Sequence, residues 1–207
     1  QTCALPILRV EGCRAGVRVE GGDYGGTTLA ALTVVSNRNA GVVLRGAVTG
    51  LTIGTVGAGV VALANGVGID VGDGASDVSI VGGRVAASLG DGIRIGGATT
   101  RRVTVRGTLV GTRADGLKAL GNAGHGIVVD RASDVQVIGC TVAASGGAGI
   151  LVQGADGTLL EDTNVGVGID RITVQGNAAG GVRILDGAQR TVVAASRVVG
   201  NAAAGIE

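Results

Sequence analysis

The sequence predicts an all-β fold, a single-stranded right-handed parallel β-helix of about seven coils with roughly 24 residues each. Three observations lead to this prediction. A Gly-apolar-x-apolar pattern recurs along the chain, a polar residue stands four positions before most of its glycines, and small residues dominate. The 207 residues include 42 Gly and 1 Tyr, with no Trp, Phe or Met. This composition is typical of short strands that are joined by tight turns.

The spacing of the pattern defines the repeat. It occurs as GVRV (16–19), GVVL (41–44), GIDV (68–71), GIRI (92–95), GIVV (126–129), GILV (149–152) and GVRI (181–184), and starts again in GIE (205–207). Successive glycines lie 25, 27, 24, 34, 23, 32 and 24 residues apart. The two long intervals indicate the same unit with an insertion, so two of the coils are predicted to carry extra loops.

Each unit is predicted to contain three strands. The Gly-apolar-x-apolar stretch is the first, and an alternating strand follows it, as in DVSIV (77–81), RRVTV (101–105), DVQVI (134–138) and RTVV (190–193). The third is a short apolar stretch at Val85, Val142 and Val198. Strands of two to five residues are too short to be stable alone, so they must stack in parallel on neighbouring coils, about 4.8 Å apart. A core then forms only through stacking.

The polar residue before each glycine marks a corner of the coil. Asn tolerates the left-handed backbone conformation, and stacked Asn side chains can form hydrogen bonds along the column, so we expect a ladder here. Glycine at the corners is expected to supply backbone angles that other residues avoid. The predicted structural positions are Asn37, Ser88, Asn122, Ser145, Asn177 and Asn201.

The pattern N-x-x-x-G-I-x-V, followed by G-A and then V-x-I, resembles the parallel β-helix repeat family of the pectin-lyase-like superfamily. The stretch GTLVGTRADGLKALGNAGHGIVVDRASDVQVIG (107–139) is similar to a segment that recurs in large secreted bacterial β-helix proteins. The resemblance covers about residues 8–207. It implies a non-catalytic structural or interaction segment of a larger secreted or cell-surface bacterial protein. The alternative that it implies is a fragment of a polysaccharide-acting lyase, epimerase or hydrolase.

The first seven residues, QTCALPI, do not follow the repeat and resemble a translated sequencing adapter. We expect residues 1–7 to be non-native and residues 8–207 to be a β-helix that is truncated at both ends. Without Cys3, the cysteines are Cys13 and Cys140. They lie about five coils apart, too far for a disulfide, and Cys140 is expected to be a small buried apolar residue.

Candidate catalytic residues come from the resemblance, which implies Asp, Arg, Lys or His on the outward face of the first strand. The outward position x of the pattern places Asp70 and Arg94 on adjacent coils, with Asp73 and Asp91 at nearby turns. A carboxylate beside a guanidinium could serve as base and charge stabiliser in an elimination. A surface ion pair across neighbouring strands explains the same residues.

The only histidine stands in the triplet Gly124-His125-Gly126, which is also found in polygalacturonases. The partner motifs of that family, Asp-Asp and Arg-x-Lys, are absent from the sequence, so His125 is interpreted as a variable turn position.

Metal ligands are scarce, because one His and two separated Cys form no zinc pattern, and no cofactor is expected. Calcium could bind the acidic turns Asp70–Asp73 or Glu161–Asp162, although solvated carboxylates are the commoner explanation.

The two insertions are the candidate interaction sites. They are expected between the second and third strands, two coils apart and on the same side. A net charge of +1 without a basic run disfavours nucleic acid, and no apolar stretch is long enough to span a membrane. The partner is expected to be a carbohydrate or another surface protein, although the lack of aromatics argues against sugar stacking. The candidate binding residues are Arg113, Asp115, Lys118, Glu161, Asp162, Asp170 and Arg171.

Overall fold

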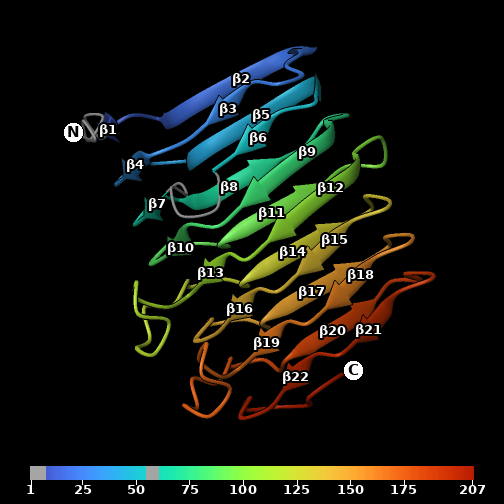
Figure 1. The fold of residues 1–207 in the computed structure, drawn as a ribbon. Coiled ribbons are helices and arrows are strands. Elements are labelled where there is room, and N and C mark those ends of the chain that lie inside the picture. The colour runs from blue at the N-terminus through green and yellow to red at the C-terminus, as the bar shows by residue number, and fades with distance from the viewer. Residues whose placement is uncertain (1–7, 55–60) are drawn as a thin grey trace.

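The computed structural model describes residues 8–54 and 61–207, and every helix or strand element in these ranges is a β-strand (Figure 1). Strands of successive coils pair in parallel, and each coil passes through three faces. The fold is therefore the right-handed parallel β-helix that the repeat predicts. Residues 1–7, for which a non-native origin is expected, lie outside the described residues. Within the described ranges, no helix is long and apolar enough to cross a membrane.

The first face contains the Gly-apolar-x-apolar strands, one from each coil. Its members, in stacking order, are β2 (Ala15–Asp23), β5 (Ala40–Thr49), β8 (Val67–Val71), β11 (Ile93–Gly96), β14 (Ile127–Asp130), β17 (Ile150–Gln153) and β20 (Val182–Leu185). Ile206 then forms an isolated parallel bridge with Val182, so the next repeat starts in the expected register.

The second face follows after a corner. Its strands are β3 (Thr28–Leu29), β6 (Thr52–Ile53), β9 (Ser76–Val81), β12 (Arg101–Arg106), β15 (Gln136–Ile138), β18 (Leu159–Glu161) and β21 (Val192–Ala194). The first and second faces form one continuous 14-stranded sheet, because β5 runs around the corner and Thr49 pairs with Ser76 of β9. At 9 and 10 residues, β2 and β5 exceed the predicted strand length of two to five.

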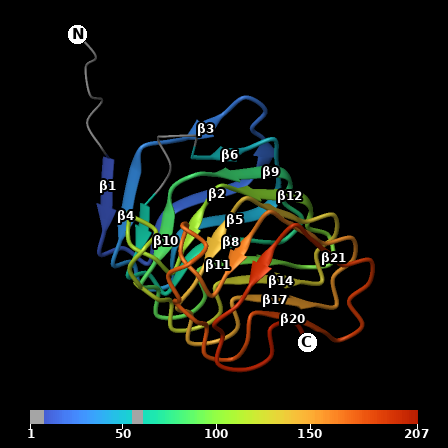
Figure 2. The ribbon, with the colours of Figure 1, turned by 60° about the horizontal axis from the view of Figure 1, so that its bottom comes forward.

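The third face is a separate 8-stranded sheet. Its strands are β1 (Leu8–Glu11), β4 (Leu32–Val35), β7 (Val61–Leu63), β10 (Arg84–Ala86), β13 (Leu109–Val110), β16 (Thr141–Val142), β19 (Asn164–Val165) and β22 (Arg197–Val198). Figure 2, in which the structure is turned, shows the three faces enclosing the interior.

The interior consists of columns in which each apolar side chain stacks on its register partner in the next coil. Ile69, Ile93, Ile127 and Ile150 form one such column on the first face, and each is at most 1% exposed. The third face contributes the column Val85, Val110, Val142 and Val165, with the same degree of burial. These columns are the core that stacking was predicted to create.

The corner between the third and first faces contains a hydrogen-bonded ladder. Asn37 donates to Oδ1 of Asn65 through its Nδ2 at 2.9 Å and through its backbone N–H at 3.0 Å. Asn177 binds Asn201 in the same way, at 2.8 and 3.1 Å. Asn65 is fully buried and belongs to the ladder, but the sequence pattern missed it. It stands three positions, not four, before Gly68.

Two serines interrupt this ladder. The backbone N–H groups of Ser88 and Ser145 donate to Oδ1 of Asn122 and Asn177, at 3.0 and 2.9 Å. Their hydroxyl oxygens are buried, and neither has a hydrogen-bond partner among the described residues. A hydroxyl group on a single methylene is too short to bridge two coils, so the ladder lacks one side-chain bond at each serine.

The glycine that opens each first-face strand is required by space. A Cβ on Gly92 would lie 2.6 Å from the carbonyl oxygen of Gly126 and 2.7 Å from Nδ2 of Asn122. Since Gly92 and its equivalents have ordinary φ angles, the expectation that they supply unusual backbone angles is wrong. It holds at other corners, such as Gly107 after β12, where φ is 59°.

Both described cysteines are free thiols, as the repeat spacing predicts. Cys140 is 1% exposed and part of the core. Burial raises the pKa of its thiol to about 11, which keeps it protonated and unreactive at neutral pH. Cys13 is exposed.

Completing the ladder should stabilise the protein. The substitution Ser145→Asn is expected to raise the free energy of unfolding by about 1 kcal/mol, because the new amide can donate to Asn177 and accept from Asn122. The equivalent space beside Gly92 already accommodates an Asn. The measurement is the urea midpoint followed by circular dichroism. Ser145→Ala, which only removes the unpartnered hydroxyl, is the control and should shift the midpoint little. A lower midpoint for Ser145→Asn would contradict the ladder as a stabilising element.

Candidate functional site

The outward row of the first face carries the charged residues that the sequence singled out. Asp70 on β8 and Arg94 on β11 are direct register partners, as predicted. Their charges, however, are paired with other residues. Arg45 on β5 forms ion pairs with Asp70 and, at 3.3 Å, with Asp73. Arg45 therefore clamps the turn 70–73 onto the neighbouring coil.

Arg94 faces a second carboxylate, on the next coil. Its guanidinium lies 3.7 Å from Asp130, whose side chain is 9% exposed and also forms an ion pair with Arg131 at 3.1 Å. Burial by itself raises the pKa of the Asp130 carboxyl. Hydrogen bonds from Arg131 and Gln153 and the charges of Arg131 and Arg94 outweigh this effect, so the pKa lies below its usual value.

These groups surround an open hollow of about 350 Å³ at the end of the first-face strands. A carboxylate there could accept a proton from a ligand, and a guanidinium could stabilise a developing negative charge. Each carboxylate already has an arginine partner, so an ion-pair network explains the same geometry. The charged residues that line the hollow are Arg45, Asp70, Asp73, Arg94, Asp130 and Arg131.

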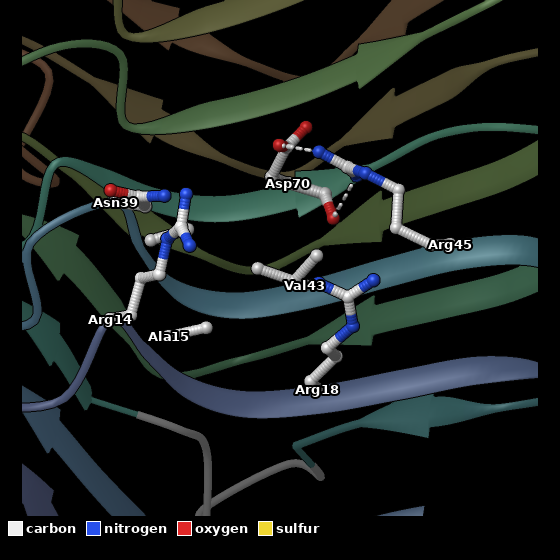
Figure 3. A pocket seen from close by; sticks show the side chains of 8 residues that line it. Arg14, Ala15, Arg18, Asn39, Val43, Arg45 and Asp70 are labelled. Carbon is white, nitrogen blue, oxygen red and sulfur yellow. Dashed lines mark hydrogen bonds and ion pairs between the residues drawn. The ribbon is translucent and has the colours of Figure 1, made fainter.

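A second hollow, of about 630 Å³, lies nearer the N-terminal end of the same face. Figure 3 shows the guanidinium groups of Arg14, Arg18 and Arg45 around Val43. Arg18 is bound to Glu20 at 2.5 Å, while Arg14 has no ion pair among the described residues. This hollow is more cationic than the first, and an anionic group is the ligand that it would favour.

Asp91 lies at the opposite end of the strand from Asp70 and Asp73, so it does not join them. Its Oδ1 accepts the backbone N–H of His125 at 2.8 Å. The His125 ring accepts the N–H of Ala148 through Nδ1 at 2.9 Å, and a Cβ on Gly147 would lie 2.7 Å from that nitrogen. The turn position of His125 therefore connects its coil to both neighbouring coils.

We expect His125→Ala to lower the free energy of unfolding by about 1–3 kcal/mol, because the buried N–H of Ala148 loses its acceptor. The measurement is urea denaturation. Lys118→Ala, at an exposed position, serves as the control and should change the stability by less than about 0.5 kcal/mol. Equal stability of the His125→Ala variant and the parent protein would show that the contact contributes nothing.

Among the described residues, no group of three or more His, Cys, Asp or Glu side chains is arranged to hold a metal ion. Of the turns considered for calcium, Asp70 and Asp73 both bind Arg45. Asp162 instead forms an ion pair with Arg171.

The insertions follow the third strand of their coils, so the expectation that they lie between the second and third strands is wrong. Loop A (residues 112–120) follows β13, and loop B (167–175) follows β19. The third strand of these coils is only two residues long, at 109–110 and 164–165, and was not recognised. The loops do lie two coils apart on the same side, where Figure 1 shows them at the lower left in yellow-green and orange.

The two loops have the same structure. An antiparallel bridge closes each of them, between Thr112 and Ala119 in loop A and between Val167 and Val174 in loop B. An aspartate then shapes each tip. Asp115 Oδ1 accepts the N–H groups of residues 117 and 118, at 2.9 and 3.2 Å, and Asp170 Oδ1 accepts those of residues 172 and 173, at 3.0 and 2.9 Å.

These hydrogen bonds perturb both carboxyl groups. The N–H groups of Leu117 and Lys118 and the nearby positive charges hold the pKa of Asp115 below its usual value of 3.8. The hydroxyl of Thr173 and the N–H groups of Ile172 and Thr173 lower the pKa of Asp170 in the same way. Asp115 and Asp170 therefore act as structural residues of the loop tips.

Loop B crosses the coil between the loops and binds loop A. The N–H of Ile169 and the side-chain amide of Gln175 both donate to the carbonyl oxygen of Gly116, at 3.2 and 3.3 Å. A Cβ on Gly116 would lie 2.9 Å from the Ile169 side chain. Thr141 and Asn164, at outward positions of the crossed face, are only 2% and 6% exposed. The two loops thus form one surface over the third face.

Not all of the candidate binding residues belong to this surface. Arg113, Asp115 and Lys118 are in loop A, and Asp170 and Arg171 are in loop B. Glu161 instead ends β18, and Asp162 occupies the corner that follows it, so placing both in the insertion is wrong. Asp162 reaches loop B only through its ion pair with Arg171.

Sequence reasoning missed Arg45 and Asp130, which both stand one residue after the Gly-apolar-x-apolar stretch. This position forms register pairs from coil to coil, such as Glu20 with Arg45, Gly96 with Asp130, and Asp130 with Gln153. That position was the available signal. Ile169 and Gln175, which join the loops, carry no comparable pattern.

Acid should loosen the loop tips before the core. Because the pKa values of Asp115 and Asp170 are depressed in the folded protein, their contribution to stability is complete above pH 3.8 and is lost as the pH falls through the lowered values. We expect amide exchange at residues 117, 118, 172 and 173 to accelerate relative to the core below that pH. Hydrogen exchange with mass spectrometry checks this. Asp115→Ala should show the fast exchange of loop A at neutral pH, and protection that stays constant down to pH 2 would contradict the assignment.

The family match agrees with this fold. A family model described as "Right handed beta helix region" matches residues 65–207. The A-module of the mannuronan C-5 epimerase AlgE6 from Azotobacter vinelandii is similar at 14% identity over 96% of this chain and 87% of that chain, with a TM-score of 0.38. The AlgE4 A-module from the same organism has 14% identity over 96% and 86%, with a TM-score of 0.32. No curated protein sequence matches the chain.

Proposed function

Since the chain belongs to the right-handed β-helix family, we propose that it is a non-catalytic structural and interaction module of a larger secreted or cell-surface bacterial protein. The observation that carries this proposal is the surface formed by loops A and B. Two hairpins of one design, from coils two apart, are bound to each other through Gly116, and they cover part of the third face. Insertions on one side of a solenoid commonly form its binding surface.

The location in a larger exported protein is supported by the resemblance of residues 107–139 to a segment of large secreted bacterial β-helix proteins. A stiff solenoid suits a spacer, because its stability comes from contacts between neighbouring coils and its length grows with each repeat.

The candidate catalytic residues also favour a non-catalytic role. Asp70 and Asp73 are engaged by one arginine, Arg45, and Asp91 accepts a backbone N–H. Hydrolysis by paired acids requires two carboxyl groups that are both available to the substrate. Each of these three carboxylates is already bound to another group of the protein.

A polysaccharide-acting enzyme is the second candidate. The observation that favours it is the hollow on the first face, in which three carboxylates and three guanidinium groups meet. Under this alternative, Asp70 would be the base and Arg94 would stabilise negative charge on a uronate.

Removing both loops should leave the solenoid intact. Deletion of 112–120 joins Val110-Gly111 to Gly121-Asn122, which reproduces the uninterrupted corner Val142-Ala143-Ala144-Ser145, and deletion of 167–175 does the same in its coil. We expect a β-type circular dichroism spectrum and an unchanged cooperative thermal transition. Loss of the fold would show that the loops serve the solenoid instead of a partner.

The parent protein and the loop-deletion variant are also incubated with polygalacturonate and alginate. The expected result is no unsaturated product by ultraviolet absorbance and no epimerisation by proton nuclear magnetic resonance. Turnover that is lost on Asp70→Asn would overturn the proposal in favour of the enzyme.

A further inference from the structure

Two hollows have lining residues on neighbouring strands of the third face, β10 and β13. The first has a volume of about 280 Å³ and an apolar wall formed by Val81, Leu109 and Ile169, with Arg106 at its edge. Ile169 comes from loop B and is 54% exposed. Loop B therefore supplies one side of this hollow, which could hold one aliphatic side chain.

The second hollow has a volume of about 580 Å³ and is lined by Arg84, Arg113, Asp115 and Leu120. The two linings are neighbours on the third-face sheet, where Arg84 of the second hollow is the register partner of Leu109 of the first. Partners in adjacent strands lie about 5 Å apart. One residue of the apolar hollow, Leu109, thus lies about one strand spacing from Arg84 in the second hollow.

The arginines around these hollows form no direct ion pair with a described residue, although Arg113 acts on the carboxylate of Asp115 as a nearby charge. Among the described residues, no carboxylate lies within ion-pair distance of Arg84, Arg106 or Arg113, and Nε of Arg84 is buried without an acceptor. The carboxylate of Asp115 is the only one that lines the second hollow, and it already accepts two N–H groups of its own loop. A chain whose net charge is only +1 therefore gathers an excess of positive charge here, with three arginines and one aspartate in the two linings.

We infer that this surface binds an acidic peptide segment of a partner protein, with an aliphatic side chain in the apolar hollow and carboxylates on Arg84 and Arg113. Arginine binds carboxylates in a bidentate manner. An aliphatic side chain buried in the neighbouring hollow would fix the position of the peptide, so that its carboxylates reach the arginines. The surface offers no aromatic side chain for a sugar to stack on. The inference rests on the proposed interaction function and names its partner.

The test uses the full chain and a phage library of random nine-residue peptides. Selection on the parent protein, after depletion on the double variant Arg84→Gln/Arg113→Gln, should enrich peptides that combine Leu, Ile or Val with two or more Asp or Glu. The leading peptide is then synthesised with a fluorescent label, and its affinity is measured by polarisation. Binding should weaken at least about tenfold in the double variant and as NaCl is raised, because the contact is electrostatic.

Matched variants separate this site from general charge. Ile169→Ser should weaken the peptide about fivefold, because it removes the wall of the apolar hollow. Arg197→Gln removes an arginine from the same outward row as Arg84, four coils away and outside both hollows. It should leave the affinity within about twofold. Circular dichroism and thermal midpoints confirm that each variant is folded.

Two results would overturn the inference. One is that the selected peptides share no acidic and aliphatic residues, or that the leading peptide binds the double variant as tightly as the parent protein. The other is binding of oligogalacturonate that depends on Arg84, with no peptide selected. Either leaves the proposed function standing if uronan turnover is absent, whereas turnover lost on Asp70→Asn removes the proposed function itself.

Discussion

Every coil must return the chain to one strand spacing from the coil before it, and the rest of the structure depends on this register. The buried Asn column enforces it at the corner between the third and first faces. Asn37 accepts a hydrogen bond from the backbone N–H of Cys13 in the previous coil and donates one to Asn65 in the next. A coil displaced along the axis would therefore leave buried polar groups without hydrogen-bond partners. The glycine beside each rung leaves room for the amide. The apolar columns then stack in register from coil to coil.

The periodic features of the sequence were sufficient to predict the fold. Inward positions alternate with a period of two within strands and repeat once per coil, so hydrophobicity alone identifies them. The prediction failed where a strand is too short to show the alternation of inward and outward residues. Leu109–Val110 is a two-residue strand, which has too few residues to alternate, and loop A was therefore placed one face too early. Asn65 was missed because a coil of slightly different length shifts its spacing from the glycine.

The charged residues of the first face show a second limit. The sequence identifies the row in which Asp70 and Arg94 stand, because strand geometry determines that row. It does not determine which partner each charge takes. A long arginine side chain reaches turns as well as strands, and Arg45 binds both Asp70 and Asp73 from an adjacent position. Ion pairing at a solenoid surface therefore depends on side-chain reach, which periodicity does not encode.

The loops combine both situations. Their design can be read from the sequence, since the aspartate at the tip and the Gly-Asn that follows occupy matching positions at 115 and 170, and at 121–122 and 176–177. Their association cannot be read in this way, because Ile169 and Gln175 have no counterpart of the same type in loop A. Identical hairpins on adjacent coils would stack as the coils do. Separated by a coil without an insertion, loop B instead crosses to Gly116, and this crossing brings Ile169 to the wall of the apolar hollow.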